Sequence, residues 1–281
     1  MKYIKIKSYA KLNLALNITG KKKNLHKIES LVTFANHHDE IFVKVINSKK
    51  HKISFYGRFS KNIEYRNTIS SLLNILEKKK LLQNIKFDIR IKKKIPIKSG
   101  LGGGSINAAC ILKFLIQKKF VNLTKNEIID ISNLIGSDVI LGFNFTNLIL
   151  NSKGQLKFFK NCRKFYILIC KPNFGCSTKK MYSKIKIFNK PKLNNPKKNM
   201  FDLDYLKKMH NSFETIAYSN YPKLRNINLF LHNSTNPDFV RMTGSGSAIV
   251  AYFQSKEKCD KAKKLFNKKY KNYWCIASKT I

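Results

Sequence analysis

The feature that most limits how this chain can fold is a glycine-rich stretch between a predicted strand and a predicted helix. It reads Ile95-Pro-Ile-Lys-Ser-Gly-Leu-Gly-Gly-Gly-Ser-Ile-Asn107. The residues before it, 85–91, alternate between apolar and polar, which is typical of a half-buried strand. After it, apolar residues recur at helical spacing, which predicts an amphipathic helix with a second, polar face. We expect the apolar face to hold Ala108, Ile111, Leu112, Leu115 and Ile116, and the other face Asn107, Lys113 and Gln117.

The composition of this stretch favours an anion site. Gly100, Gly102, Gly103 and Gly104 have no Cβ atom, so they can adopt positive φ and let backbone N–H groups converge. The start of the helix adds unpaired N–H groups and a partial positive charge. Together these features predict a site for phosphate, although a plain tight connection has the same composition.

Two common phosphate loops are excluded by the order of the residues. No Gly-Lys-Ser or Gly-Lys-Thr follows the glycines, so the stretch is not the P-loop of the common NTPases. The Gly-x-Gly-x-x-Gly register of dinucleotide folds is also missing, because Ser105 and Asn107 stand where its last glycine belongs.

Length and composition indicate a folded, cytoplasmic protein. The 281 residues are enough for one large or two ordinary domains, and 43% of them are hydrophobic. No apolar run is long enough to span a bilayer, and residues 1–8 alternate like a strand instead of resembling a signal peptide. The six cysteines lack Cys-x-x-Cys spacing, which predicts free thiols and no zinc site. They are Cys110, Cys162, Cys170, Cys176, Cys259 and Cys275.

The net charge of +41 suggests a polyanionic partner at first sight. However, the lysines are spread along the whole chain and do not cluster with aromatic residues in a reading motif for nucleic acid. We therefore expect a small-molecule substrate, with neither nucleic acid nor membrane as a partner. The positive field would still attract a phosphorylated substrate.

Two polar motifs outside the glycine stretch also attract attention. In the predicted strand 10–17, Lys11 and Asn13 share one face, so their polar groups point into the same space. The alternative is a surface strand on which both side chains are exposed to solvent. Asp138 lies between the end of a predicted helix and an apolar run, in a chain with 15 acidic and 56 basic residues. A capping or turn carboxylate is the alternative interpretation of Asp138.

The helix before Asp138 is predicted from its start signal. Thr124 and Glu127 have the spacing of a capping box. The pattern that follows predicts that the helix buries Ile128, Ile131, Leu134 and Ile135. His37, His38 and Asp39 are expected to form a surface turn, and residues 19–24 a polar turn.

A change of composition at residues 151–163 predicts two domains, 1–155 and 156–281. The first is β-rich, with mostly antiparallel strands, and contains a helix over 67–76. The second begins with a buried strand at 165–170, followed by a solvated loop at 184–198. Helices are predicted at 205–219 and 222–232, then a glycine-rich turn at 241–247 that enters a strand, a lysine-rich helix and a last strand. This alternation is typical of an α+β domain.

The segments 10–13, 95–107 and 243–246 together resemble the three signature motifs of the small-molecule kinase superfamily that includes galactokinase, homoserine kinase and mevalonate kinase. The superfamily's Pro-x-x-x-Gly-Leu-Gly-Ser-Ser-type loop is similar to the stretch from Pro96 to Ser105. The motifs follow in the same order along the whole chain. The resemblance implies an α+β, two-domain small-molecule kinase fold, with an N-terminal β-rich ATP domain that is ribosomal-protein-like and a C-terminal open α/β sandwich.

The resemblance also implies roles for individual residues. ATP and Mg²⁺ are the expected cofactors, with Asp138 as the catalytic base and Lys11 as the lysine that assists it. Mg²⁺ is expected to bridge phosphate oxygens, and no protein side chain is assigned to it. The ATP loop would comprise Pro96, Ile97, Lys98, Ser99, Gly100, Leu101, Gly102, Gly103, Gly104, Ser105 and Ile106.

In detail, the Gly-Gly-Gly-Ser, Ala-Lys-Leu-Asn and Gly-Ser-Asp-Val motifs resemble one branch of this superfamily. That branch phosphorylates the 2-hydroxyl of a cytidine diphosphate-linked methylerythritol in the non-mevalonate isoprenoid pathway. The resemblance implies that Tyr182 stacks on the cytosine ring and that His26 binds its polar edge. The full set of implied substrate contacts is Asn13, His26, Thr178, Tyr182, Gly244 and Gly246.

Several positions depart from the pattern of this branch. Leu25 replaces an aromatic residue before His26, and a leucine can press on a ring but cannot provide π-stacking. Lys98 and Ser99 replace small residues, and we expect Lys98 to point outward. Ile106 replaces a serine and Ile140 a proline. A kinase for another small alcohol, such as homoserine, is the alternative within the superfamily, and a nucleic-acid binder is the alternative outside it.

Overall fold

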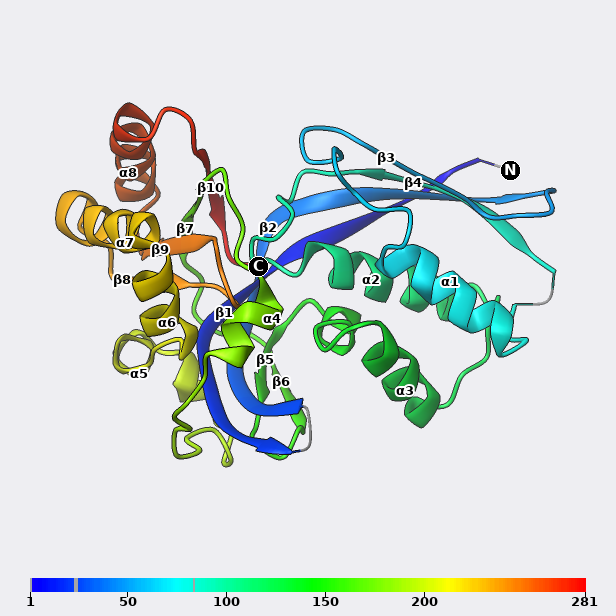
Figure 1. Ribbon diagram of the computed structural model, residues 1–281, viewed down its shortest axis with the longest axis horizontal. Helices are drawn as coiled ribbons and strands as arrows, with labels where there is room; N and C mark the ends of the chain where they lie inside the picture. Colours follow the sequence, from blue (N-terminus) through cyan, green and yellow to red (C-terminus); the bar gives the residue numbers. More distant parts are fainter. Residues whose placement is uncertain (1, 23–24, 83) are drawn as a thin grey trace. The chain divides into compact units, whose positions relative to one another are not determined.

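The computed structural model describes residues 2–22, 25–82 and 84–281, and of Leu25 the backbone only (Figure 1). The chain forms two compact units that alternate along the sequence. The first unit comprises residues 1–10, 37–97 and 102–145, and the second comprises 11–36, 98–101 and 146–281. The contiguous domain boundary near residue 155 stays a prediction.

The first unit contains one end of a sheet built on two long strands, β1 (Ile4–Lys22) and β2 (Leu25–Ile46). Here β2 pairs antiparallel with β4 (Lys86–Lys92), and β3 (Lys52–Tyr56) pairs with β4 in parallel. The expected antiparallel pairing is confirmed for β2, and β3 is a strand that the sequence did not predict. The alternation of β4 is confirmed, because Phe87, Ile89 and Ile91 are buried while Arg90 and Lys92 face solvent.

The helices of the first unit are α1 (Thr68–Lys78), α2 (Gly103–Gln117) and α3 (Lys125–Ile135), followed by the short helix η1 (Ile140–Phe143). They lie on one side of strands β3 and β4 (Figure 1). Helix α1 begins where Asn67 accepts hydrogen bonds from the backbone N–H groups of Ile69 and Ser70. Asparagine at this position satisfies donors that a helix start leaves unpaired.

The predicted capping box of α3 is confirmed. The Glu127 carboxylate accepts a hydrogen bond from the Thr124 backbone N–H at 2.8 Å, and the Thr124 hydroxyl accepts one from the Glu127 N–H. The predicted inner face is wrong in part, because Leu134 is 66% exposed whereas Ser132 is buried. Helix α3 packs against α1 and η1 through a narrow stripe, so it covers fewer positions than its apolar pattern offers.

Helix α2 differs from the predicted amphipathic helix. Asn107, expected on a polar face, is 1% exposed, and every residue from Ile106 to Leu112 is buried. The side chain of Asn107 donates a hydrogen bond to the Asp39 carboxylate at 3.0 Å. Asp39 is itself fully buried within β2, so the predicted surface turn around it is wrong.

The second unit is built on a four-stranded antiparallel sheet with the order β10-β7-β9-β8. These strands are β7 (Tyr166–Lys171), β8 (Phe239–Met242), β9 (Ile249–Phe253) and β10 (Trp274–Lys279). The helices are α4 (Thr178–Ser183), η2 (Lys198–Phe201), α5 (Leu203–Lys208), α6 (Phe213–Asn220), α7 (Pro222–Thr235) and α8 (Lys256–Lys269). Apolar side chains from α6, α7 and α8 form one core with those of the sheet, including Phe213, Leu231, Phe253 and Phe266.

The single helix predicted over residues 205–219 is wrong. The structure has two short helices, α5 and α6, separated at residues 209–212. Asn211 in this gap is buried, and its side-chain amide donates to the backbone carbonyls of Met242 and Gly244 at 2.7 and 2.8 Å. These hydrogen bonds draw the backbone away from a continuous helix.

The remaining strands of the second unit continue from β2. Its first half pairs antiparallel with β5 (Asn147–Leu150), which pairs with β6 (Leu156–Phe159). Strand β1 runs to Lys22, so the predicted polar turn is wrong up to that residue, and its last positions, 23 and 24, lie outside the described residues. Among the helices that the structure describes, none is long and apolar enough to cross a membrane. All six cysteines are free, as predicted.

Candidate active site

Three segments that are far apart in the sequence meet around the side chain of Asn13 in the second unit. The backbone N–H of Asn13 donates to the Thr243 hydroxyl at 3.1 Å, and the Gly244 N–H donates to the Asn13 side-chain oxygen at 2.9 Å. The backbone N–H of Lys11 donates to the carbonyl of Leu101 at 2.9 Å. The strand motif, the glycine stretch and the second glycine turn are therefore directly bonded to one another.

Gly100 and Gly244 make this close approach possible. Both have positive φ, +77° and +54°, and the backbones of their two turns touch. A Cβ atom on Gly100 would lie 2.0 Å from the carbonyl oxygen of Thr243, far inside any real contact. Beside this contact, the Ala248 N–H donates to the Ser99 carbonyl at 3.0 Å. Glycine is thus required at Gly100 both for its conformation and for the space it leaves.

Lys11 is a buried cation at this junction. It is 2% exposed, and its ammonium group donates to the Asn13 side-chain oxygen at 2.6 Å. The amide nitrogen of Asn13 in turn donates to the Ser30 hydroxyl at 2.8 Å. The interpretation of Lys11 and Asn13 as part of an exposed surface strand is wrong. A buried lysine held by an oriented amide is suited to facing an anion.

Two further side chains support the second glycine turn. Asn211 binds the carbonyls of Met242 and Gly244, as described above, and the Gly246 N–H closes the turn onto the Thr243 carbonyl at 3.0 Å. The Thr178 hydroxyl lies 2.9 Å from that of Ser245. The sequence did not predict a role for Asn211, although an asparagine that interrupts a helical pattern is a recognisable signal.

The second half of the glycine stretch opens α2 in the first unit. Gly102 precedes the helix with φ of +70°, and the first intrahelical hydrogen bond runs from the Ile106 N–H to the Gly102 carbonyl at 2.9 Å. A glycine at this position provides no side-chain cap, so the N–H groups of the first turn point toward whatever lies beyond the helix start. The Ser105 hydroxyl lies 3.3 Å from where a Cβ on Gly136 would be. Half-buried Asp138 follows two residues after Gly136, in the turn between α3 and η1.

A buried carboxylate that the sequence analysis missed fixes the entry to this helix. Asp39 accepts hydrogen bonds from the backbone N–H groups of Lys94 and Ile95 at 2.7 and 2.8 Å. It also accepts from the Asn107 amide and from the Lys93 ammonium group, which is buried as well. One aspartate therefore ties the residues before the glycine stretch to the first turns of α2. Its position two residues before the apolar pattern that begins at Ile41 gave no signal of this role.

The other predicted loop residues differ in their exposure. Lys98 is exposed, in agreement with the prediction that it points outward, and its backbone has φ of +50°. Pro96 and Leu101 are buried, and Ile97 is at the surface. The side chain of Ile106 is in the core beside Gly142. Ile106 can therefore reach a ligand only through its backbone.

A group of aromatic rings surrounds His26 in the second unit. The imidazole ring lies 4.8 Å from the ring of Tyr182 with an interplanar angle of 31°. Tyr182 packs edge-on against buried Phe213 at 4.9 Å. Desolvation, followed by the charge of Lys21, lowers the pKa of His26, so the ring is neutral at neutral pH. The side chain of Leu25, flagged in the sequence, lies outside the described residues.

A metal site made of protein ligands is not evident. Among the described residues, no group of three histidine, cysteine, aspartate or glutamate side chains is arranged to hold a metal ion. The side-chain oxygen atoms in this part of the first unit include those of Ser105 and Asp138, and that of Thr68, whose hydroxyl donates to the Gly104 carbonyl at 2.8 Å. This donor set fits a Mg²⁺ ion that takes most of its ligands from phosphate oxygens and water.

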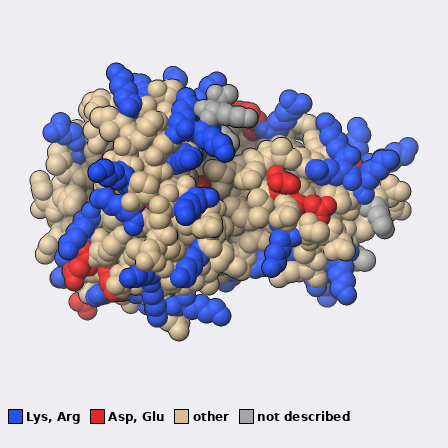
Figure 2. Space-filling model, turned by 90° about the horizontal axis from the view of Figure 1, so that it is seen from below, with Lys and Arg blue, Asp and Glu red and all other residues tan. Residues whose placement is uncertain are grey.

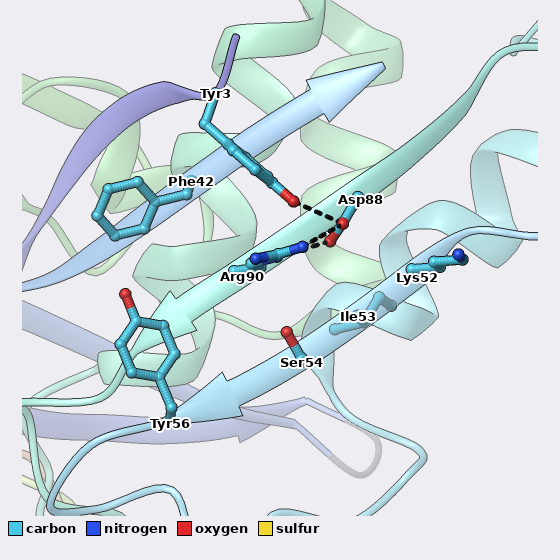
Figure 3. Close-up of a pocket in the computed structure, with 8 residues that line it drawn as sticks. All are labelled: Tyr3, Phe42, Lys52, Ile53, Ser54, Tyr56, Asp88 and Arg90. Atoms are coloured by element: carbon cyan, nitrogen blue, oxygen red, sulfur yellow. Dashed lines mark hydrogen bonds and ion pairs between the residues drawn. The ribbon is translucent and has the colours of Figure 1, made fainter. Parts of the chain in front are cut away.

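A separate hollow of about 630 Å³ lies on the solvent-facing side of β2, β3 and β4 (Figure 3). Its polar groups bind one another, since the Tyr3 hydroxyl donates to Asp88 at 2.6 Å and Arg90 pairs with the same carboxylate at 3.1 Å. The Arg90 guanidinium lies 4.7 Å from the centre of the Tyr3 ring. None of the predicted site residues is among the described residues that line this hollow. The glycine motifs therefore stay the candidate active site, and this hollow lies apart from them.

Comparison with known proteins defines the class. Residues 67–144, from α1 to just beyond η1, match the model of the GHMP kinases N terminal domain. The whole fold is similar to a crystal structure of 4-(cytidine 5'-diphospho)-2C-methyl-D-erythritol kinase, with a TM-score of 0.80, 19% identity and 99% of each chain covered. It is also similar to homoserine kinase from Cytophaga hutchinsonii, with a TM-score of 0.71, 17% identity, and 100% of this chain and 95% of that one covered. The chain has the fold and the glycine motifs of a GHMP kinase.

The sequence narrows this class further. A curated relative from Pelagibacter ubique (strain HTCC1062), named 4-diphosphocytidyl-2-C-methyl-D-erythritol kinase, is 56% identical over 281 residues, and the match covers 100% of both chains. The protein belongs to the family of 4-diphosphocytidyl-2-C-methyl-D-erythritol kinases. The resemblance seen in the sequence motifs is thereby confirmed.

Proposed function

We propose that this protein transfers the γ-phosphate of ATP to the 2-hydroxyl of 4-diphosphocytidyl-2-C-methyl-D-erythritol, in the non-mevalonate isoprenoid pathway. The 56% identity to a relative named for this activity supports the choice of substrate. The observation that carries the proposal is the junction at Asn13, where the strand motif and both glycine turns are hydrogen-bonded together.

The acceptor alcohol needs help to attack phosphorus, because a neutral hydroxyl is a weak nucleophile. We assign Asp138 as the base that accepts the proton of the 2-hydroxyl as the new phosphorus–oxygen bond forms. We assign Lys11 to the stabilisation of the negative charge that develops on the reacting oxygens. Its hydrogen bond to Asn13 at 2.6 Å fixes the direction of the ammonium group.

The phosphates of ATP would be bound by backbone N–H groups at the start of α2 and in the glycine stretch. The Ser105 hydroxyl is suited to a phosphate oxygen or to Mg²⁺. When bound, Mg²⁺ would neutralise part of the negative charge of the phosphates, with Ser105 as the candidate protein ligand. Asp39 acts as a positioning residue here, because it holds the backbone that enters the glycine stretch.

The cytidine end of the substrate would bind beside His26 and Tyr182. Tyr182 offers a ring for stacking, and the neutral imidazole of His26 can donate one hydrogen bond and accept another at the polar edge of cytosine. Gly244 and Gly246 would allow the second glycine turn to approach the phosphates of the substrate. Asn13 and Thr178 are the remaining contacts that we propose.

We also propose that the partners of this protein are small molecules, neither nucleic acid nor membrane, and that it acts in the cytoplasm. Figure 2 supports the first point, because lysine and arginine side chains are spread over the whole visible face and do not form one patch. Six free cysteines are consistent with a reducing compartment. The general positive field would attract a substrate that carries a diphosphate.

The decisive experiment measures ADP release from ATP with a panel of alcohols that includes the cytidylyl alcohol and homoserine. We expect turnover with the cytidylyl alcohol and at most weak turnover with the others. Indifference to the cytidylyl alcohol, or preference for homoserine, would overturn the proposed substrate. RNA binding that persists at saturating ATP and substrate, without any turnover, would instead support a nucleic-acid binder.

The role of Lys11 is tested with the Lys11→Ala variant. Because the ammonium group is proposed to act on charge that develops during the reaction, kcat should fall about 100-fold or more. An effect confined to KM would make Lys11 a binding residue only.

A further inference from the structure

The segment between α4 and η2 contains an exposed aromatic side chain near His26. Phe188 is 44% exposed, and its ring centre lies 6.3 Å from that of His26, with an interplanar angle of 51°. The imidazole of His26 therefore has an aromatic neighbour in Phe188 as well as in Tyr182. The two neighbours come from different segments, one from helix α4 and one from the irregular chain that follows it.

This irregular segment is largely exposed, as its lysine-rich sequence predicts, but hydrogen bonds tether it to the rest of the second unit. Asn189, directly after Phe188, donates its backbone N–H to the Ile18 carbonyl at 2.9 Å and its side-chain amide to the Ser212 hydroxyl at 3.1 Å. The position of Phe188 is therefore fixed on one side by bonds to β1 and to the residue before α6.

A second anchor follows three residues after Asn189. Glu29, fully buried in β2, accepts hydrogen bonds from the backbone N–H groups of Lys192 and Leu193 at 2.7 and 2.9 Å. The Asn17 amide donates both to this carboxylate and to the Lys190 carbonyl. A buried carboxylate saturated by hydrogen bonds makes a rigid attachment. The segment is thus held before any ligand binds, so it loses little conformational freedom on binding.

Phe188 is an exposed aromatic ring that stands at a fixed position beside His26, the residue that we propose for the polar edge of the cytosine. Position 25, the usual place of an aromatic in the resembling branch, is a leucine here. We propose that Phe188 is a substrate-binding residue that stacks on the pyrimidine ring together with Tyr182, and so supplies the aromatic contact that Leu25 cannot. This inference rests on the proposed function, because it names a further residue of the same cytidine site.

The alternative role of Phe188 is structural, as a cover for His26 and Tyr182. The two roles predict different results. A structural cover stabilises the fold, so its loss lowers the free energy of unfolding and weakens the binding of both substrates through general loosening. A stacking residue contributes only when the pyrimidine is bound, so its loss raises the KM for the cytidylyl alcohol and leaves that for ATP unchanged.

The test compares Phe188→Ala with Phe188→Trp and with the control Ile187→Ala, whose side chain is 82% exposed beside Phe188. We expect Phe188→Ala to raise the KM for the cytidylyl alcohol about tenfold, within the range that removal of one base–aromatic stack gives. Phe188→Trp should restore most of the affinity, and Ile187→Ala should behave like the wild type. The KM for ATP and the urea midpoint of unfolding should change little in all three variants.

Direct binding of CMP, measured by calorimetry in the absence of turnover, provides a second readout. Weaker CMP binding by Phe188→Ala than by the wild type would support the inference. An unchanged KM and unchanged CMP affinity would overturn it while the wild type still phosphorylates the cytidylyl alcohol, so the proposed function would survive. Absence of wild-type turnover with that alcohol would overturn the proposed function itself, and the inference with it.

Discussion

Substitution of Gly100 by alanine is the sharpest test of the junction between the two glycine turns. Alanine would have to adopt φ of +77°, which for a residue with a Cβ atom costs roughly 1–2 kcal/mol. Its Cβ would also lie 2.0 Å from the Thr243 carbonyl oxygen, and backbone cannot move aside as cheaply as a flexible side chain. Overpacking of this kind adds about 1–3 kcal/mol. The total cost of the substitution is about 2–5 kcal/mol. It would be seen either as a lower free energy of unfolding or as a displacement of one of the two turns that relieves the strain.

Gly154 is the matched control. Its φ is +81°, and a Cβ atom there would meet no atom within 4 Å. Gly154→Ala should therefore carry only the conformational part, about 1–2 kcal/mol, and should leave catalysis intact. The assay pairs urea unfolding with kcat/KM for both substrates. For Gly100→Ala we expect the larger loss of stability together with a fall in kcat/KM of about 100-fold, since a displacement near 1 Å has that effect.

The result that would refute this reasoning is equality of the two variants. If Gly100→Ala and Gly154→Ala lose the same stability and keep the same kcat/KM, then the close approach of the turns is unimportant. A loss of activity by Gly100→Ala with no greater loss of stability would agree with the reasoning, because the strain would then have displaced the turn without unfolding the unit.

The other predictions concern charge and protonation. Asp138→Asn should lower kcat by at least about 100-fold while ATP still binds, and near-normal kcat would exclude Asp138 as the base. Asp39→Ala would leave the buried Lys93 ammonium group without its carboxylate. It should therefore lower the free energy of unfolding, measured in urea, by about 3–5 kcal/mol, and a decrease below about 1 kcal/mol would contradict this. Desolvation lowers the pKa of five histidines in the folded protein. Below about pH 6.5 the unfolded chain therefore binds more protons than the folded one, and the melting temperature should fall as the pH drops. A melting temperature that does not change over this range would count against the burial of these histidines. These histidines are His26, His37, His51, His210 and His232.

Features that depend on neighbouring residues in the sequence were predictable. The strand at 86–92, the capping box at Thr124 and the helix that follows the glycine stretch all have local causes, namely side-chain alternation and hydrogen bonds over three or four residues. The order of the three motifs was enough to indicate the kinase superfamily. Local signals of this kind need no knowledge of what packs against them.

Errors arose where a distant segment decided the local structure. Asn107 has the polarity of a surface residue, but Asp39, on another strand, gives it a buried partner. The helix predicted over residues 205–219 is broken because Asn211 binds backbone carbonyls of the second glycine turn. In both cases a buried hydrogen bond outweighs the local pattern, since an unpaired polar group in the interior is costly.

The sequence by itself therefore indicated the glycine stretch, the prediction that it binds an anion, and the kinase family. Only the tertiary structure decided that Lys11 is buried against Asn13, that Asp39 fixes the start of α2 and that Glu29 holds the segment carrying Phe188. Residue type alone predicts exposure at each of these three positions, because lysine, aspartate and glutamate are ordinarily at the surface. Asp39 and Glu29 are buried because distant segments of the chain bring hydrogen-bond donors to them, and Lys11 is buried beside Asn13, whose side chain is held by Ser30 and Gly244. Sequence periodicity carries no information about such distant partners.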